Sequence, residues 1–258
     1  MRAQGVLVTT WWMLRRTLWR YRLWQGLYAI MLRFMRPALW KKTPNKRTHI
    51  VIEGFPRSAN TFLVHYLRLA THDELNVAHH LHDAGQVDRA LRMDLPVFVL
   101  LRDPLDAVVS WSLKQPLLPP AQMLRTYHAF YLLLQLRKQA PCFIRFEDAI
   151  SEPMAVIEEI IRRTGLESSI SASVKNQQVF DSIENERRQR AKSPAMGAQF
   201  DLSVAYPTRA KEARKRDVET ALMGEHAELI EQARELYRQL LGLSLDFDAA
   251  PTTTCLGS

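Results

Sequence analysis

The chain has 258 residues, of which 47% are hydrophobic and 24% charged, a composition typical of a globular protein with a sizeable core. Residues 1–52 contain eleven Lys or Arg and no acidic residue, whereas the rest carries 24 basic and 27 acidic residues. The net charge of +8 therefore belongs to the N-terminus, which argues against nucleic-acid binding by the main domain. Cys142 and Cys255 have no CxxC or Cys/His spacing, so we expect neither a disulfide framework nor a zinc site. This use of cysteine fits a reducing compartment.

The N-terminal segment combines arginines with five of the six tryptophans. One helical face is free of arginine and comprises positions 14, 17, 21, 24, 28, 31 and 35, which predicts one amphipathic helix. Its apolar runs are shorter than the roughly 20 residues that span a bilayer, and no signal-peptide cleavage site is evident. A basic, Trp-rich helix is typical of membrane interfaces, so we expect residues 1–40 to bind a membrane surface. The alternatives are packing on the protein's own domain and a heptad-like seam in a homodimer.

After a polar linker at residues 41–47, residues 49–69 predict a strand, a tight polar turn and a helix. The β-branched run at residues 50–52 is typical of a buried strand, and Gly54 and Pro56 end it. The first N–H groups of a helix lack intrahelical partners and carry about half a positive charge, so such a turn suits phosphate. A Walker A loop, GxxxxGK[ST], is absent, which disfavours a nucleotide triphosphatase.

Strands and helices alternate along the following segments. Further strands are predicted within residues 75–78, 97–101 and 142–146, and helices within 105–113, 120–140, 153–164 and 225–241. This alternation predicts a parallel sheet with right-handed crossover helices. Residues 167–220 are rich in charge and predict surface helices and loops. We expect a helical segment with its linker, one main domain and a disordered tail, at residues 1–47, 48–250 and 251–258.

The turn GFPRSANTFL resembles the 5′-phosphosulfate loop of sulfotransferases that use 3′-phosphoadenosine 5′-phosphosulfate (PAPS), which typically reads PKSGTTW or PRSGTT. In this resemblance Arg57, Ser58 and Thr61 match the Lys or Arg, the Ser and the second Thr. Ala59 replaces Gly and Asn60 replaces the first Thr. Ala59 is tolerable if its backbone lies in right-handed space, and Asn60 can still donate a hydrogen bond.

A second motif, VFVLLRDPLDAVVSW, resembles the family's 3′-phosphate motif, in which a strand ends in R-[DN]-P and a helix bearing a Ser follows. Arg102 at the strand end can bind a phosphate dianion in a fork, and Ser110 matches the family's second ligand. The segment CFIRFEDAISEP resembles a later family segment, whose Glu147 and Asp148 we expect to be structural. A late basic loop has a loose counterpart at residues 207–216, with Arg209 and Lys211 as candidate phosphate ligands. The resemblance covers about residues 48–166.

The resemblance implies a three-layer α/β fold with a parallel central sheet of the P-loop NTPase-like type, here with an added N-terminal amphipathic helix. It also implies in-line transfer of the sulfuryl group from PAPS to an acceptor hydroxyl or amine, with 3′-phosphoadenosine 5′-phosphate (PAP) as product and no metal. Arg57 would stabilise the leaving PAP. The predicted cofactor-binding residues are Arg57, Ser58, Ala59, Asn60, Thr61, Phe62, Arg102, Ser110 and Arg209.

The acceptor must lose a proton, and His80 is the predicted general base. It follows the second strand and precedes Arg102 by 22 positions, as the family's catalytic His does. His79 and His82 are rivals, and so are Glu74 and Asp83, because some related enzymes use Glu. The acceptor itself, whether saccharide, lipid-linked or small molecule, is not specified. The alternatives to a cytoplasmic, peripheral sulfotransferase are a P-loop-like small-molecule kinase and a non-catalytic nucleotide-binding protein at the membrane.

Overall fold

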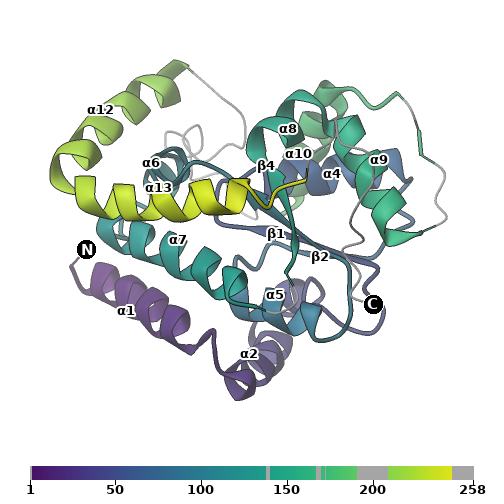
Figure 1. The fold of residues 1–258 in the computed structure, drawn as a ribbon, viewed down its shortest axis with the longest axis horizontal. Helices are drawn as coiled ribbons and strands as arrows, with labels where there is room; N and C mark the ends of the chain where they lie inside the picture. The colour runs from purple at the N-terminus through teal and green to yellow at the C-terminus, as the bar shows by residue number, and fades with distance from the viewer. Residues whose placement is uncertain (1, 138–139, 167–169, 172, 191–208, 246–258) are drawn as a thin grey trace.

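The computed structural model describes residues 2–137, 140–166, 170–171, 173–190 and 209–245. Figure 1 shows the strands between two groups of helices. The elements in chain order are α1 (Arg2–Leu18), α2 (Arg22–Met35), α3 (Pro37–Trp40), β1 (Ile50–Gly54), α4 (Asn60–Ala70), β2 (Val77–His79), α5 (Ala84–Leu91), β3 (Val97–Leu101), α6 (Pro104–Lys114), α7 (Pro120–Gln135), β4 (Cys142–Arg145), α8 (Phe146–Ser151), α9 (Pro153–Thr164), α10 (Asn176–Arg190), α12 (Arg209–Glu225) and α13 (Ala227–Leu241).

The described strands form one all-parallel sheet with the order β2–β1–β3–β4, which confirms the predicted α/β class. Ile52 lies opposite Phe98, and Leu100 lies opposite Ile144. Strands β1 and β3 are buried along their whole length, which explains the unbroken apolar run of β3, whereas β1 also buries Glu53. The chain passes from β1 to β2 on one side and from β3 to β4 on the other. The carboxyl ends of β1 and β3 therefore frame the crevice where open α/β sheets bind ligands.

Two apolar clusters cover the two faces of the sheet, an arrangement compatible with a three-layer fold. Val51 and Val99 contact the cluster that contains α5, α6, α7 and α13. Ile52 and Phe98 contact the opposite cluster, which contains α4, α9 and α10. Alternate residues of β1 and β3 thus supply the two cores. Helix α1 packs on the outer side of α7 (Figure 1).

The N-terminal segment forms three helices, α1, α2 and the four-residue α3, so the prediction of a single helix with one apolar face was wrong. Trp19 follows α1, lies in the core at 1% exposure and packs edge-on against Phe130, with 5.8 Å between the ring centroids. The turn at residues 19–21 changes the helical phase, because α2 starts afresh at Arg22. Part of the predicted face is consequently buried, since Tyr28 packs against Leu81.

Cys142 of β4 is disulfide-bonded, which contradicts the expectation of no disulfide. Its partner lies outside the described residues. Separation along the sequence does not report distance in space, so spacing patterns alone could not find this bond. A disulfide is typical of oxidising compartments and counts against the expected reducing one. The expected tail at residues 251–258 also lies outside the described residues.

Helix α7 ends at Gln135, five residues before the predicted end at residue 140. The predicted end of the helix at residues 153–164 is confirmed, because Gly165 caps α9 in the left-handed conformation with φ 62°. None of the described helices combines the length and the apolar character needed to cross a membrane.

Candidate active site

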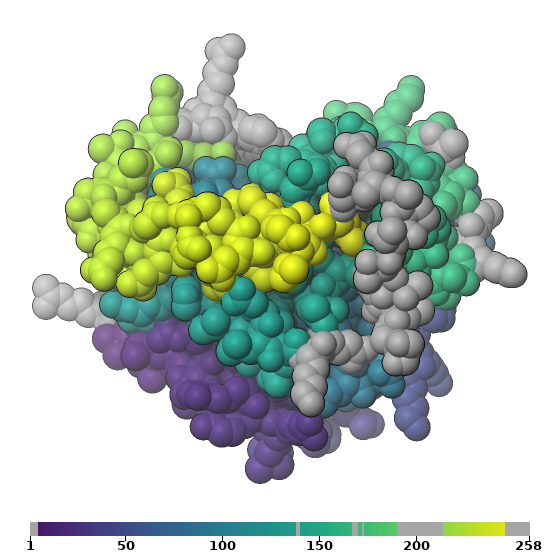
Figure 2. All heavy atoms as spheres, viewed as in Figure 1, coloured from purple at the N-terminus to yellow at the C-terminus, as the bar shows by residue number. Residues whose placement is uncertain are grey.

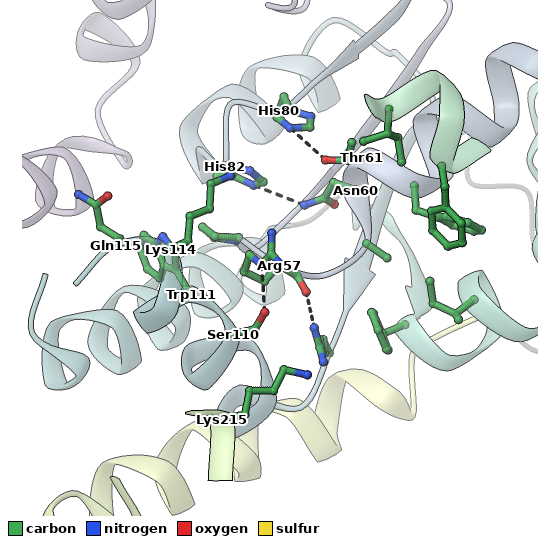
Figure 3. Close-up of a pocket in the computed structure, with 18 of the residues that line it drawn as sticks. Arg57, Asn60, Thr61, His80, His82, Ser110, Trp111, Lys114, Gln115 and Lys215 are labelled. Atoms are coloured by element: carbon green, nitrogen blue, oxygen red, sulfur yellow. Dashed lines mark hydrogen bonds between the residues drawn. The ribbon is translucent and has the colours of Figure 1, made fainter. Parts of the chain in front are cut away.

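A cavity of about 320 Å³ lies at the carboxyl ends of β1 and β3 (Figure 3). The turn after β1 and the first turn of α4 form its floor, while Arg102 at the end of β3 and Ser110 of α6 line one side. His80 and His82, from the segment after β2, line another side. The location is the topological switch point of the sheet, the position from which a ligand can reach loops of several strands.

The turn between β1 and α4 has a backbone suited to anions. Arg57 and Ala59 have φ values of 72° and 67°, and Ser58 between them is not among the residues with positive φ. Such alternation brings successive N–H groups into a concave, anion-binding arrangement. No side chain caps the start of α4, whereas Asp83 and Asp103 cap α5 and α6. The condition under which Ala59 would be tolerated without strain, a right-handed backbone, is not met, because the chain turns from β1 into α4 within residues 55–59.

Close packing holds this turn in place. A Cβ atom on Gly54 would lie 2.8 Å from the Oδ1 atom of Asn60 and 2.9 Å from the carbonyl oxygen of Leu100, so only glycine fits. The Asn60 amide donates to the carbonyls of Gly54 and Phe55 at 3.3 and 3.2 Å. The Tyr131 hydroxyl donates to the Leu100 carbonyl at 2.6 Å and accepts from the Phe55 N–H at 3.3 Å. These bonds join the turn to β3.

Four cationic side chains line the cavity: Arg57, Arg102, Lys114 and Lys215. Its described lining contains no Asp or Glu. The Nε of Arg57 donates to the Oγ of Ser110 at 3.0 Å, and Nη1 of Arg102 donates to the Arg57 carbonyl at 2.7 Å. Burial, with a further effect of the Arg102 charge, lowers the pKa of Arg57 to about 10. Burial and the neighbouring Arg57 also lower the pKa of Lys114. Buried like charges are costly unless an anion joins them, so this lining suits a polyanion.

The histidines after β2 divide between the strand and the cavity. His79 ends β2 and is buried away from the cavity lining, as its alternation along the strand predicts. His80 Nε2 lies 3.2 Å from Thr61 Oγ1, and His82 Nδ1 lies 2.8 Å from the Gly54 carbonyl oxygen. Burial is the main reason that the pKa values of all three fall below the ordinary range, to about 4 for His82.

Two buried ionisable side chains, Glu53 and Arg15, fix the backbone of residues 81–83. The Glu53 carboxylate accepts from the N–H groups of Leu81 and His82 at 2.6 and 3.1 Å, and burial raises its pKa to about 7. Arg15 of α1 donates to the Asp83 carboxylate at 3.0 Å and also to the Leu81 carbonyl. The rival bases Asp83 and Glu74 do not line the cavity. No sequence motif marked Glu53 or Arg15.

Most of the predicted cofactor residues share this one cavity: Arg57, Ala59, Asn60, Thr61, Phe62, Arg102 and Ser110. Ser58 is fully buried beneath the turn and outside the lining, and its N–H donates to the Phe55 carbonyl at 3.3 Å. The side chains of Arg209 and Lys211 lie outside the described residues. Sequence reasoning missed Lys114 and Lys215. They lie one helical turn after Ser110 and Lys211, so helical spacing could have indicated both.

Comparison of the chain with protein-family models, with curated proteins and with solved structures gave no match. Within the part of the chain that the structure describes, no group of three or more His, Cys, Asp or Glu side chains is arranged to hold a metal ion.

Proposed function

We propose that this protein is a sulfotransferase that moves the sulfuryl group of PAPS to an acceptor hydroxyl or amine. One observation carries the proposal: Arg57 of the 5′-phosphosulfate-like turn and Arg102 and Ser110 of the 3′-phosphate-like motif line the same cavity. PAPS bears anionic groups at both the 5′ and 3′ positions of one ribose, so it needs two anion sites close together. The described lining offers no carboxylate for the Mg²⁺ of a kinase, which favours PAPS over ATP.

In this proposal each side of the cavity has a distinct task. Arg57, Thr61 and the first turn of α4 hold the 5′-phosphosulfate, and Arg102 with Ser110 holds the 3′-phosphate. Aromatic side chains suited to a purine ring line the same cavity, and the rings of Phe62 and Phe180 lie 5.8 Å apart between centroids. Lys114 adds positive charge on the side of the histidines (Figure 3).

For sulfuryl transfer, the protein must position the two reactants and stabilise the negative charge that develops on the leaving group. The acceptor oxygen forms a bond to sulfur while the bond from sulfur to the 5′-phosphate oxygen breaks, and the electron pair leaves with PAP. Arg57 and the N–H groups of the turn stabilise that developing charge. We expect Arg57→Ala to lower PAPS turnover by at least roughly 10²-fold, the usual loss when a group that stabilises developing charge is removed. A variant with near wild-type turnover would exclude this role of the turn.

The experiment that tests the proposal is a thermal shift of the purified protein with PAP, compared with AMP, ADP and ATP plus magnesium. At about 100 times its Kd, PAP should add about 2.7 kcal/mol of stability. We expect this shift to disappear in Arg102→Ala and to persist in Arg216→Ala, an exposed position on α12 outside the cavity. A shift with ATP and magnesium but none with PAP would support a kinase instead. PAP binding without any PAPS turnover would indicate a non-catalytic nucleotide-binding protein.

We further propose that α1 and α2 bind an anionic membrane surface. Four apolar side chains form a stripe along α2 at helical spacing, with exposures from 51% to 78%. They are Leu23, Leu27, Ile30 and Phe34. Exposed Arg22, Arg33 and Arg36 lie on the same helix or at its end, and no acidic residue occurs in residues 1–52. Figure 2 shows α1 along one edge of the molecule. A membrane-borne, lipid-linked acceptor fits this arrangement.

A further inference from the structure

The hydrogen bonds around His80 determine which of its ring nitrogens carries the proton. Arg68 Nη2 lies 3.3 Å from His79 Nε2, and His79 Nδ1 lies 3.2 Å from His80 Nδ1. Arginine has only donors, so His79 Nε2 must accept, and a neutral His79 carries its proton on Nδ1. That proton is donated to His80 Nδ1. A neutral His80 therefore carries its own proton on Nε2 and donates it to Thr61 Oγ1 at 3.2 Å.

His82 has the opposite arrangement. Its Nδ1 lies 2.8 Å from the carbonyl oxygen of Gly54, which can only accept, so Nδ1 carries the proton. The Asn60 amide nitrogen lies farther from Nδ1, at 3.4 Å, and has the Gly54 and Phe55 carbonyls as acceptors. The lone pair of a neutral His82 is then on Nε2, for which the described residues provide no hydrogen-bond partner. Of the two histidines that line the cavity, His82 alone presents a proton acceptor.

We propose that His82, rather than His80, is the general base, and that His80 serves as an N–H donor beside Thr61. This inference rests on the proposed sulfotransferase function and departs from the sequence-based choice of His80. The acceptor O–H proton moves to Nε2 of His82 as the bond from oxygen to sulfur forms. The bond from sulfur to the 5′-phosphate oxygen breaks, and its electron pair leaves with PAP.

The surroundings of His82 fit this role. After proton transfer, the Nδ1–H of the imidazolium still donates to the Gly54 carbonyl, and a Glu53 carboxylate oxygen lies 4.0 Å from Nδ1. The positive charges of Lys114, Arg15 and Arg57 disfavour a positive charge on the His82 ring. The negative charge of a bound phosphosulfate offsets these cations, so the imidazolium is favoured when the donor is present.

The tautomers can be measured without any ligand. Protein labelled with ¹⁵N in its histidines is recorded at neutral pH in long-range ¹H–¹⁵N correlation spectra, which show the protonated nitrogen of each ring. Single His substitutions assign the signals. We expect His82 with its proton on Nδ1 and His80 with its proton on Nε2. A proton on Nε2 of His82 would overturn the proposal, whatever the outcome of the PAP binding experiment.

Matched substitutions test the same inference in turnover. His82→Asn keeps an amide near Nδ1 but removes Nε2, and His80→Gln keeps an N–H near Nε2. The readout is release of PAP from PAPS with water or a simple alcohol as acceptor. We expect His82→Asn to lower it roughly 10²–10⁴-fold while the PAP thermal shift remains, and His80→Gln to lower it at most about tenfold. His128→Asn on α7, outside this cavity, is the control. The reverse order of losses would overturn the proposal, whereas a wild type that gives no PAP shift would overturn the proposed function itself.

Discussion

Ala59, in the turn between β1 and α4, has a strained backbone. Its φ of 67° lies in the left-handed region, which costs an L-residue about 1–2 kcal/mol and glycine almost nothing. Because glycine also loses more entropy on folding, we expect Ala59→Gly to raise the free energy of unfolding by about 0.5–1 kcal/mol. Denaturant unfolding measures this change. Ala155→Gly within α9 is the control and should lower stability by about 1 kcal/mol. A loss of stability in Ala59→Gly would contradict the strain.

Glu53 makes stability depend on pH. The folded protein keeps its carboxyl proton up to about pH 7, whereas the unfolded chain releases it near 4.5. The folded state therefore binds more protons in this window, and this group's contribution lowers the free energy of unfolding as the pH rises through it. We expect Glu53→Gln to gain stability relative to wild type between roughly pH 5 and pH 8, on the order of 3 kcal/mol.

Denaturation of both proteins across this pH range measures the difference. Glu158→Gln, at an exposed position on α9, is the matched control. A Glu53→Gln protein whose stability difference from wild type is independent of pH would mean that Glu53 titrates near its ordinary value when folded. The absolute loss from replacing one acceptor oxygen does not affect this comparison, because it is present at every pH.

At single positions, the sequence predicted candidate site residues where these belong to a motif of residues adjacent in sequence. The turn with Arg57 and the strand end with Arg102 were found because strand, turn and helix are encoded locally. The burial of Ser58 was not predicted, because it depends on packing beneath the turn. The contrast between His80 and His82 depends on partners such as Arg68 and the Gly54 carbonyl, which the folded chain brings together.

Helices α1 and α2 support the segment that carries the histidines. Arg15 of α1 binds the Asp83 carboxylate and the Leu81 carbonyl, and Tyr28 of α2 packs against Leu81. The pair of Arg15 and Asp83 spans 68 positions in sequence and is buried on both sides. The N-terminal helices therefore belong to the scaffold of the site as well as to the surface of the molecule.

Removing one member of this pair should be costly. Arg15→Met leaves the Asp83 carboxylate buried with only its bonds from the first turn of α5, so we expect a loss of about 3 kcal/mol in the free energy of unfolding. Arg20→Met, at an exposed position, should change stability by less than about 0.5 kcal/mol. The double variant Arg15→Met with Asp83→Asn should recover part of the loss. Equal stability of the two single Arg variants would contradict this role of the pair.

Helices and strands were predicted best where the local sequence pattern was strong. Strand β3 matches residues 97–101, and α9 matches residues 153–164, because an apolar run and a glycine cap are unambiguous signals. The N-terminal segment was mispredicted because periodicity was followed through residues 19–21. The burial of Trp19 breaks that periodicity, and a tertiary contact of this kind leaves no periodic signal in the sequence.

In the whole molecule, the exposed apolar surface and the cavity are linked through the N-terminal helices. Trp12 of α1 lines the cavity and packs edge-on against Trp111, with 4.9 Å between centroids, whereas its neighbours Trp11 and Met13 are exposed. Helix α1 thus contributes both to the lining of the cavity and to the exposed apolar surface.

The membrane proposal predicts binding to vesicles with anionic lipid and weaker binding to zwitterionic ones. Each Arg near the surface adds about 1 kcal/mol, so added salt should weaken the binding. The double variant Leu27→Gln with Phe34→Gln should lose most of it in co-sedimentation. Leu136→Gln with Leu243→Gln, two other exposed leucines outside α2, should retain it. Equal vesicle binding by both variants would exclude the α2 stripe as the contact. A wild type that dimerises without vesicles, while the stripe variant stays monomeric, would identify the same face as a dimer seam.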